Sequence, residues 1–237
     1  MKYKIVISFI TIIITLFLLI NYNKEIIVKH WIIIIISLMF FSIIFILLQY
    51  ESGKISSKEI SLIAILSGFS AVLRIPFVAI PSVQPCTFII ICTGYVFGPI
   101  PGFMVGATTA LISNIFLGHG PWTIFQIFAW GIIGIIASFL PKINIKKFGL
   151  AINGVLSGFL FGWITNLWFF IGYIYPHNIS TFIFSMSSSL AFDTMHAIGN
   201  LLLFIILGEK TIKIMKRYKD RFHIEYINYS KPEKINI

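Results

Sequence analysis

Charged residues are scarce in this sequence: they make up 11% of its 237 residues, and only eight residues are acidic. Soluble globular domains carry about 25% charged residues, so this composition excludes an ordinary soluble protein. Hydrophobic residues account for 58% of the chain. They form long continuous runs rather than the short alternating segments of a membrane β-barrel. The composition therefore predicts an all-α integral membrane protein.

Several catalytic and nucleotide-binding signatures are also absent. The chain contains no P-loop for ATP, no His-Glu-x-x-His zinc motif and no Gly-x-Ser-x-Gly nucleophile motif. Cys86 and Cys92 lack a metal-binding or redox spacing, so we expect no metal, no cofactor and no disulfide. The apolar segments also lack the ladder of carboxylates typical of a proton-driven pump. These absences favour a binding protein whose energy, if it transports, comes from another subunit.

The apolar runs predict about eight transmembrane helices. A helix needs about 20 apolar residues to cross the hydrocarbon core, and only the fourth segment is clearly short. The first follows Lys2 and Lys4, as a signal peptide would, but it is long and no small-residue cleavage site follows it. We therefore expect it to be retained. The segments are residues 4–22, 31–49, 59–74, 86–98, 101–117, 122–140, 149–171 and 181–208.

The positions of lysine and arginine predict the orientation. With a cytoplasmic N-terminus, all but three of the 18 basic residues fall on the inside, the exceptions being Lys24, Lys29 and Arg74. Cytoplasmic loops of membrane proteins carry such an excess, so we expect both termini to be cytoplasmic and the protein to lie in the cell membrane. The basic tail, residues 209–237, suits anionic lipid or a cytoplasmic partner, and we expect no nucleic acid to bind.

Small residues recur every four positions in two of the segments, and each series leads to an asparagine, Asn114 or Asn166. Residues four apart lie on one helical face, and small residues there allow helix backbones to approach closely. We therefore expect both helices to be tightly packed. Each asparagine either bonds to a neighbouring helix or contacts a ligand. The two series are Gly102, Gly106 and Ala110, and Gly154, Gly158 and Gly162.

The last apolar segment carries a polar face at membrane depth. An ionisable group there is costly and needs a partner or a cavity. The expected partner of Asp193 is His196, one turn along, or Arg74 if the loop folds inward. The residues of this polar face form either a hydrogen-bonded cluster that fixes helix packing or part of a ligand site. Its members are Ser185, Ser189, Asp193, His196 and Asn200.

A second polar face begins at the glycine-rich turn 118–121. Trp122, Gln126 and Trp130 follow at steps of four, and Trp130 is too deep for an interfacial aromatic. It is either a stacking wall for a flat ligand or part of the core. The outer loops 74–85, 118–121 and 172–180 either cover a pocket or are short turns. Apolar walls with a few convergent polar groups are typical of small-molecule sites.

The stretch from Arg74 to Leu140, with the later Asp193, His196 and Asn200, resembles the substrate-binding S components of energy-coupling factor (ECF) transporters. The resemblance covers residues 59–208 and is nearest to the branch that includes cobalamin-type S components. It implies a six-helix bundle, here preceded by an extra N-terminal helical hairpin (1–58) and followed by the basic tail (209–237). The motifs are PSVQP (81–85), GYVFGP (94–99), Ser113-Asn114, and GHGPWT (118–123) with Gln126 and Ala129-Trp130-Gly131.

The resemblance implies a function. S components bind a vitamin-like micronutrient from outside, beneath the loop that here is 74–85. They then join a transmembrane T component and two cytoplasmic ATPases and topple in the bilayer. Their first core helix meets the T component through small residues four apart, a pattern that Ala64, Ser67, Gly68 and Ala71 match. The metal-transporting branch begins Met-His, whereas this chain begins Met1-Lys2, so nickel and cobalt ions are not expected.

The expected substrate is a corrinoid, with a flavin or a pteridine as alternatives. A different class of function is an intramembrane enzyme that uses Asp193 and His196 as an acid–base pair, although no nucleophile or metal motif accompanies them. A small-molecule sensor is a third alternative, without an appended signalling domain. The expected substrate-binding residues are Arg74, Gln84, Asn114, His119, Trp122, Gln126, Trp130, Asn166, Ser189, Asp193 and His196.

Overall fold

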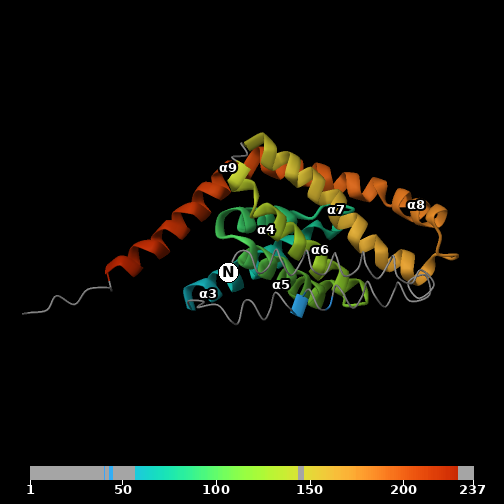
Figure 1. Ribbon diagram of the computed structural model, residues 1–237, viewed down its shortest axis with the longest axis horizontal. Helices are drawn as coiled ribbons and strands as arrows, with labels where there is room; N and C mark the ends of the chain where they lie inside the picture. The colour runs from blue at the N-terminus through green and yellow to red at the C-terminus, as the bar shows by residue number, and fades with distance from the viewer. Residues whose placement is uncertain (1–39, 41–42, 45–56, 144–146, 229–237) are drawn as a thin grey trace, which may run out of the picture. The chain divides into compact units, whose positions relative to one another are not determined.

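A computed structural model describes residues 40, 43–44, 57–143 and 147–228 of the chain. The chain divides into two compact units, Met1–Ile44 and Phe45–Ile237. The second unit contains the labelled helices of Figure 1. The two predicted N-terminal spans and most of the predicted hairpin 1–58 lie outside the described residues.

The described part of the second unit is helical and contains no strand, which confirms the all-α prediction. Within the described residues, five helices are long and apolar enough to cross a membrane, and α4 and α8 are shorter apolar helices. The chain is thus a multi-pass membrane protein. The elements are α3 (Ser57–Arg74), η1 (Pro76–Ala79), α4 (Pro85–Phe97), α5 (Pro99–Leu117), α6 (Trp122–Ala137), η2 (Leu140–Ile143), α7 (Lys147–Tyr173), α8 (Ile179–Ser188) and α9 (Leu190–Asn228).

Proline and glycine set several of the helix boundaries. Pro85 and Pro99 occupy the first turns of α4 and α5, where the missing N–H has no helical partner to lose. Gly98 and Gly118 follow the last residues of α4 and α5 and have φ values of 104° and 98°. Residues that carry a Cβ rarely adopt this backbone conformation. The N–H of Gly118 still donates to the carbonyl of Asn114 at 2.8 Å. α5 therefore ends at a position whose backbone conformation favours glycine.

The predicted final span, 181–208, is not one helix: α8 ends at Ser188 and α9 begins at Leu190. The Ser188 hydroxyl donates to the carbonyl of Ser185 at 2.7 Å, and the Ser189 hydroxyl oxygen lies 3.0 Å from the carbonyl oxygen of Met186. Such local bonds compete with the helical ladder, and they coincide with the break. In the other direction α9 continues to Asn228, so the predicted tail 209–237 begins inside a helix, as the red end of α9 in Figure 1 shows.

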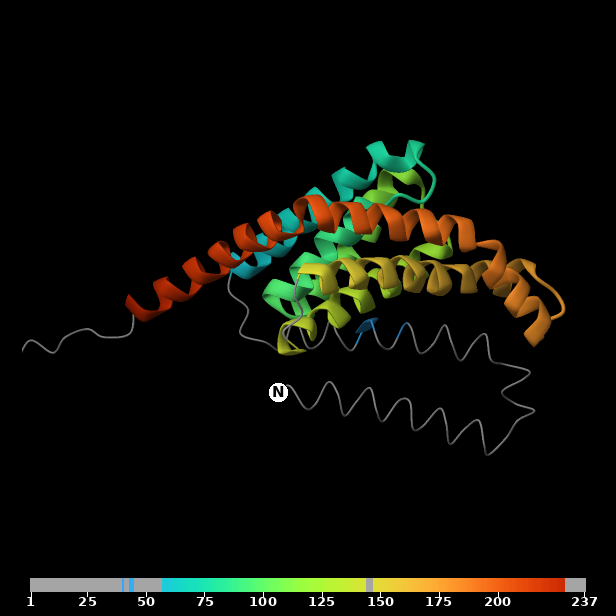
Figure 2. The same cartoon turned by 90° about the horizontal axis from the view of Figure 1, so that it is seen from above.

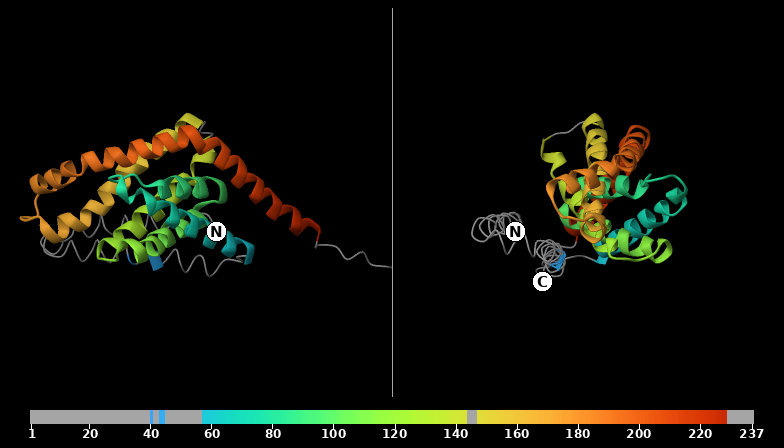
Figure 3. Two further views of the ribbon diagram at one scale, coloured as in Figure 1. Left: turned by 180° about the vertical axis from the view of Figure 1, so that it is seen from behind. Right: turned by 90° about the vertical axis from the view of Figure 1, so that its right-hand side faces the viewer.

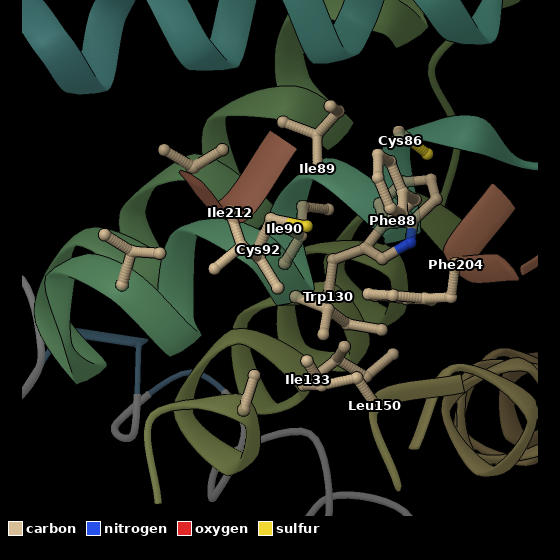
Figure 4. Close-up of a cluster of buried hydrophobic side chains, with 14 of the residues drawn as sticks. Cys86, Phe88, Ile89, Ile90, Cys92, Trp130, Ile133, Leu150, Phe204 and Ile212 are labelled. Atoms are coloured by element: carbon tan, nitrogen blue, oxygen red, sulfur yellow. The ribbon is translucent and has the colours of Figure 1, made fainter. Parts of the chain in front are cut away.

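α4 lies at the centre of the packing. It contacts α3, α5, α6, α7 and α9, and all but two of its 13 residues are buried. A helix that is apolar on every side is typical of such a buried position. Figure 4 shows its side chains Phe88, Ile89, Ile90 and Cys92 gathered with Trp130 of α6 in the hydrophobic core.

The two predicted glycine series form tight helix contacts. A Cβ at Gly106 of α5 would lie 2.5 Å from the Trp130 carbonyl oxygen of α6. A Cβ at Gly158 of α7 would lie 2.7 Å from the Ala197 nitrogen of α9. Both distances are too short for a real side chain, so these positions require glycine. Figures 2 and 3 show the result for the second pair, where yellow α7 runs beside the orange part of α9. The prediction of two tightly packed helices is confirmed.

Candidate functional site

Arg74, the last residue of α3, is the centre of a buried polar network. It is only 9% exposed. Its Nε donates to Gln84 Oε1 at 2.9 Å, and its Nη1 donates to Ser113 Oγ and Asn114 Oδ1, both at 2.7 Å. Its guanidinium also lies 4.9 Å from the centre of the Trp130 ring, within the range of a cation–π contact. The arginine therefore ties the α3–α4 connection to α5 and α6.

Asn114 extends this network across the bundle. Its Nδ2 donates to Thr123 Oγ1 at 3.0 Å and to Gln126 Oε1 at 2.8 Å, while its Oδ1 accepts from Arg74. The residue is 1% exposed, and these bonds use both amide hydrogens and the carbonyl oxygen of its side chain. Of the two roles predicted for Asn114, the structure shows the interhelical hydrogen bond.

A second buried cluster joins α4, α6 and α9 through Thr87. Trp130 Nε1 donates to Thr87 Oγ1 at 2.9 Å, and Thr87 Oγ1 lies 2.8 Å from His196 Nε2. Trp130 stacks on Phe161 of α7 with ring centres 4.5 Å apart. Phe161 meets the His196 ring edge-on at 5.1 Å. Trp130 and His196 are thus core residues that connect four helices.

A cavity of about 260 Å³ opens between α6, α7 and α9, and we call it the α6–α7–α9 cavity. Its polar lining consists of Ser82, Gln126, Thr165, Asn166, Ser189 and Asp193. Its aromatic lining consists of Trp122, Phe161, Trp168, Phe169 and Phe192. The rings of Trp122 and Trp168 lie 5.4 Å apart. Aromatic walls with a few polar groups are what a small-molecule site requires.

Asp193 is the acidic group of this cavity. It is 4% exposed, and its Oδ2 accepts from the Ser189 hydroxyl at 2.9 Å. It packs directly over Gly162 of α7, where an added Cβ would collide with its carboxylate. In the described structure no hydrogen bond or ion pair joins Asp193 to His196 or to Arg74. The predicted acid–base pair is therefore not assembled, because His196 bonds to Thr87 instead.

A second cavity, of about 270 Å³, lies under the connection between α3 and α4, and we call it the α3–α4 cavity. Arg74 and Gln84 line it together with Ser82, which also lines the first cavity. Its other walls are apolar: Phe77, Val78, Ile80, Val83 and Leu117. The two cavities thus share one residue, Ser82, of the 75–84 segment.

Seven of the eleven predicted site residues line one of the two cavities. Trp122, Gln126, Asn166, Ser189 and Asp193 line the α6–α7–α9 cavity, and Arg74 and Gln84 line the α3–α4 cavity. Asn114 lies in the network between the cavities, and Trp130 and His196 lie in the core. His119 is exposed and lines neither cavity; its Nδ1 lies 3.5 Å from Thr123 Oγ1.

Several residues of the site were missed by the sequence analysis. Thr87, Ser113 and Thr123 supply hydroxyl groups to the two networks, and Phe161 and Trp168 supply aromatic walls. Ser113 and Thr123 lie within motifs that carry the family resemblance. Nothing in the sequence distinguishes the other three from residues of their type in apolar helices. The serine and threonine residues of a membrane helix often bond only within that helix, as Thr93 does with Ile89.

The small residues of α3 point in two directions. Ser67 and Ala71 are buried at 0% and 1% exposure and belong to the interior. Ala64 is exposed, and a Cβ at Gly68 would meet no atom within 4 Å. Of the four residues predicted for subunit contact, only Ala64 and Gly68 therefore lie on an open surface of the described structure.

Comparison with known proteins finds a matching family model and relatives of low sequence identity. A family model described as ECF transporter, substrate-specific component, matches residues 58–208. A UPF0397 protein of Aliivibrio salmonicida is 24% identical over 179 residues, which cover 72% of this chain and 97% of the relative. A UPF0397 protein of Vibrio atlanticus is 24% identical over 180 residues, covering 69% of this chain and 94% of the relative. No solved structure matches at a significant level.

Proposed function

Because the chain belongs to the family of ECF transporter substrate-specific components, we propose that it binds a vitamin or related micronutrient from outside the cell for ATP-driven uptake. The family makes the chain a transporter subunit rather than an enzyme, with a T component and ATPase subunits as partners. We propose that two cytoplasmic ATPases drive the transport, that the protein lies in the cell membrane and that both of its termini are cytoplasmic.

The observation that best supports this proposal is the α6–α7–α9 cavity. Gln126, Asn166 and Asp193 approach it from three helices, two of which, α7 and α9, are held at close range by the glycine contacts of α7. Gln126 Oε1 is used by Asn114, which leaves its amide nitrogen for a ligand. A site of this kind offers both donors and acceptors to a molecule with an apolar body.

The cavities also bear on the size of the substrate. Ligand cavities for drug-sized molecules have volumes of about 300–1,000 Å³, and the two cavities here are about 260 and 270 Å³. A corrinoid, the substrate expected from the resemblance, is larger than either cavity. A flavin or a pteridine needs less room, and its flat ring can pack against the aromatic walls of the α6–α7–α9 cavity. We propose the smaller flat compounds as the better candidates and keep a corrinoid in the test.

We further propose that Ala64 and Gly68 of α3 form the contact with the T component. They lie on the open face of the helix. Their exposed neighbours Ile65, Phe69 and Val72 make this face apolar. Small residues within an apolar face let a second membrane helix approach closely. Ser67 and Ala71 have the same spacing but serve packing inside the subunit.

The test is to purify the full chain in detergent from cells grown in rich medium and to identify any released small molecule by mass spectrometry. We expect a stoichiometric micronutrient. The Asn166→Leu variant should retain at least tenfold less of it, because Asn166 lines the cavity. The matched control is Asn153→Leu, which changes a buried asparagine of the same helix away from both cavities and should retain the compound. Equal retention by both variants would contradict the assignment of the cavity.

A further inference from the structure

We propose that the substrate carries a carboxylate and that the α3–α4 cavity binds it through Arg74, Gln84 and Ser82. This inference rests on the proposed function and adds the chemical class of the substrate. It concerns the second cavity, whose polar groups differ in kind from those of the α6–α7–α9 cavity.

The first observation is that the charge of Arg74 is not neutralised. Its three hydrogen bonds all go to uncharged oxygens, those of Gln84, Ser113 and Asn114. Within the described residues no aspartate or glutamate pairs with it, and Asp193 lines the other cavity. Burying a charge without a counter-charge is unfavourable. An anionic ligand would supply the missing charge.

The second observation is the direction in which Arg74 is fixed. Nε and Nη1 are held by Gln84, Ser113 and Asn114, and the guanidinium lies against Trp130 at 4.9 Å. Nη2 is the nitrogen that has no hydrogen-bond partner in the described structure, and Arg74 lines the α3–α4 cavity. Because the guanidinium is planar and held at two nitrogens, the free donor is already oriented before a ligand binds.

The remaining polar groups of this cavity match the same ligand. Gln84 uses its Oε1 to accept from Arg74, so its amide nitrogen remains as a donor. Ser82 adds a hydroxyl from a residue with a φ of 59°. No acidic side chain lines the cavity. A carboxylate accepts at both oxygens, so a guanidinium, an amide and a hydroxyl can bind it together.

Charge and shape favour a carboxylate over a phosphate. Arg74 is the one cation among the residues that line the cavity, so a dianionic phosphate would keep an unbalanced charge in an apolar site. The other walls, including Phe77, Val78 and Val83, suit the apolar body of an organic acid. Ser82 also lines the α6–α7–α9 cavity, so the proposed carboxylate site borders the cavity that has the aromatic walls.

The experiment measures binding of matched acids and neutral amides to the purified full chain in detergent. The probes are nicotinate and nicotinamide, biotin and its amide, and pteroate and its amide, with riboflavin and cyanocobalamin as vitamins without a carboxylate. We expect at least one acid to bind at least tenfold more tightly than its amide. Arg74→Gln should abolish this preference.

Because Arg74 also connects helices, a second variant keeps the test valid if Arg74→Gln fails to fold. Ser82→Ala leaves the Arg74 hydrogen bonds intact and should weaken acid binding severalfold, without weakening the binding of the amide. Ser138→Ala is the matched control: the Ser138 hydroxyl bonds to the carbonyl of Ile135 in the preceding helix α6, and acid binding should not change.

The outcomes separate this inference from the proposed function. A compound without a carboxylate, bound by the protein or released from it, overturns the inference and supports the proposed function. Equal binding of an acid and its amide, unchanged in Ser82→Ala, also overturns the inference alone. If no probe binds and the purified protein releases no small molecule, both are overturned.

Discussion

Replacing Thr87 by valine tests the buried network between α4, α6 and α9. Valine has a similar shape but no hydroxyl, so Trp130 Nε1 loses its acceptor and His196 Nε2 loses its partner. The three side chains are at most 1% exposed, and water cannot replace the lost bonds. The variant therefore leaves two polar groups unpaired in the core.

The expected loss lies between two limits. An unpaired buried polar group costs about 1–3 kcal/mol, whereas interhelical hydrogen bonds in a membrane protein average about 0.6 kcal/mol. For two bonds we expect a loss of about 2 kcal/mol in the free energy of unfolding. A change of this size lowers the melting temperature by about 4–8 °C in a domain of this length. Thermal unfolding of the detergent-solubilised protein, followed by tryptophan fluorescence, measures it.

Thr93 provides a matched control in the same helix. It is also fully buried, but its hydroxyl donates only to the carbonyl of Ile89, one turn earlier. Thr93→Val therefore leaves no donor unpaired, and we expect a loss below about 0.5 kcal/mol. Equal losses in the two variants would refute the reasoning. Ligand affinity should be unchanged in both, because neither threonine lines a cavity.

Two further predictions concern the glycine and alanine positions of the helices. Gly68→Leu should leave folding and ligand binding intact, because the surroundings of Gly68 are open, but it should abolish uptake with the T component. Ala71→Leu should instead lower the free energy of unfolding by about 1–3 kcal/mol, because Ala71 is buried and the larger side chain overpacks the interior. Normal transport by Gly68→Leu would show that this face is not the subunit contact. Gly158→Ala should push α7 away from Ala197 and lower the melting temperature by several degrees, while Gly172→Ala, with nothing within 4 Å, should not; similar melting curves would contradict the close packing.

Most of the described helices could be predicted because hydropathy indicates their apolar runs. Proline and glycine then indicate several of their ends. The predicted segment 86–98 corresponds to α4 (Pro85–Phe97), which begins at Pro85 and is followed by Gly98. The last segment failed because the serines at the break, including Ser185 and Ser189, were interpreted as part of one polar helical face, and apolar residues resume at Leu190. α9 also extends beyond its apolar residues, because the lysine, arginine and glutamate residues that follow are good helix formers.

The site was predictable to the extent that single-helix patterns determine it. Asp193 and Gln126 stand out as polar residues at membrane depth, and both line the cavity. The roles of Thr87 and Trp130 depend on how α4, α6 and α9 cross, which no periodicity within one helix specifies. The same holds for Arg74, whose hydrogen-bond partners lie up to 40 residues away in the sequence.

The most direct test of the account is uptake by proteoliposomes that contain this chain, a T component and two ATPase subunits. The compound to follow is the small molecule released from the purified chain. We predict that it accumulates only when the chain and ATP are both present, and that Asn166→Leu lowers accumulation at least tenfold while Asn153→Leu does not. Equal accumulation without the chain, or binding that ATP never converts into uptake, would contradict the assignment of this protein as the substrate-specific subunit.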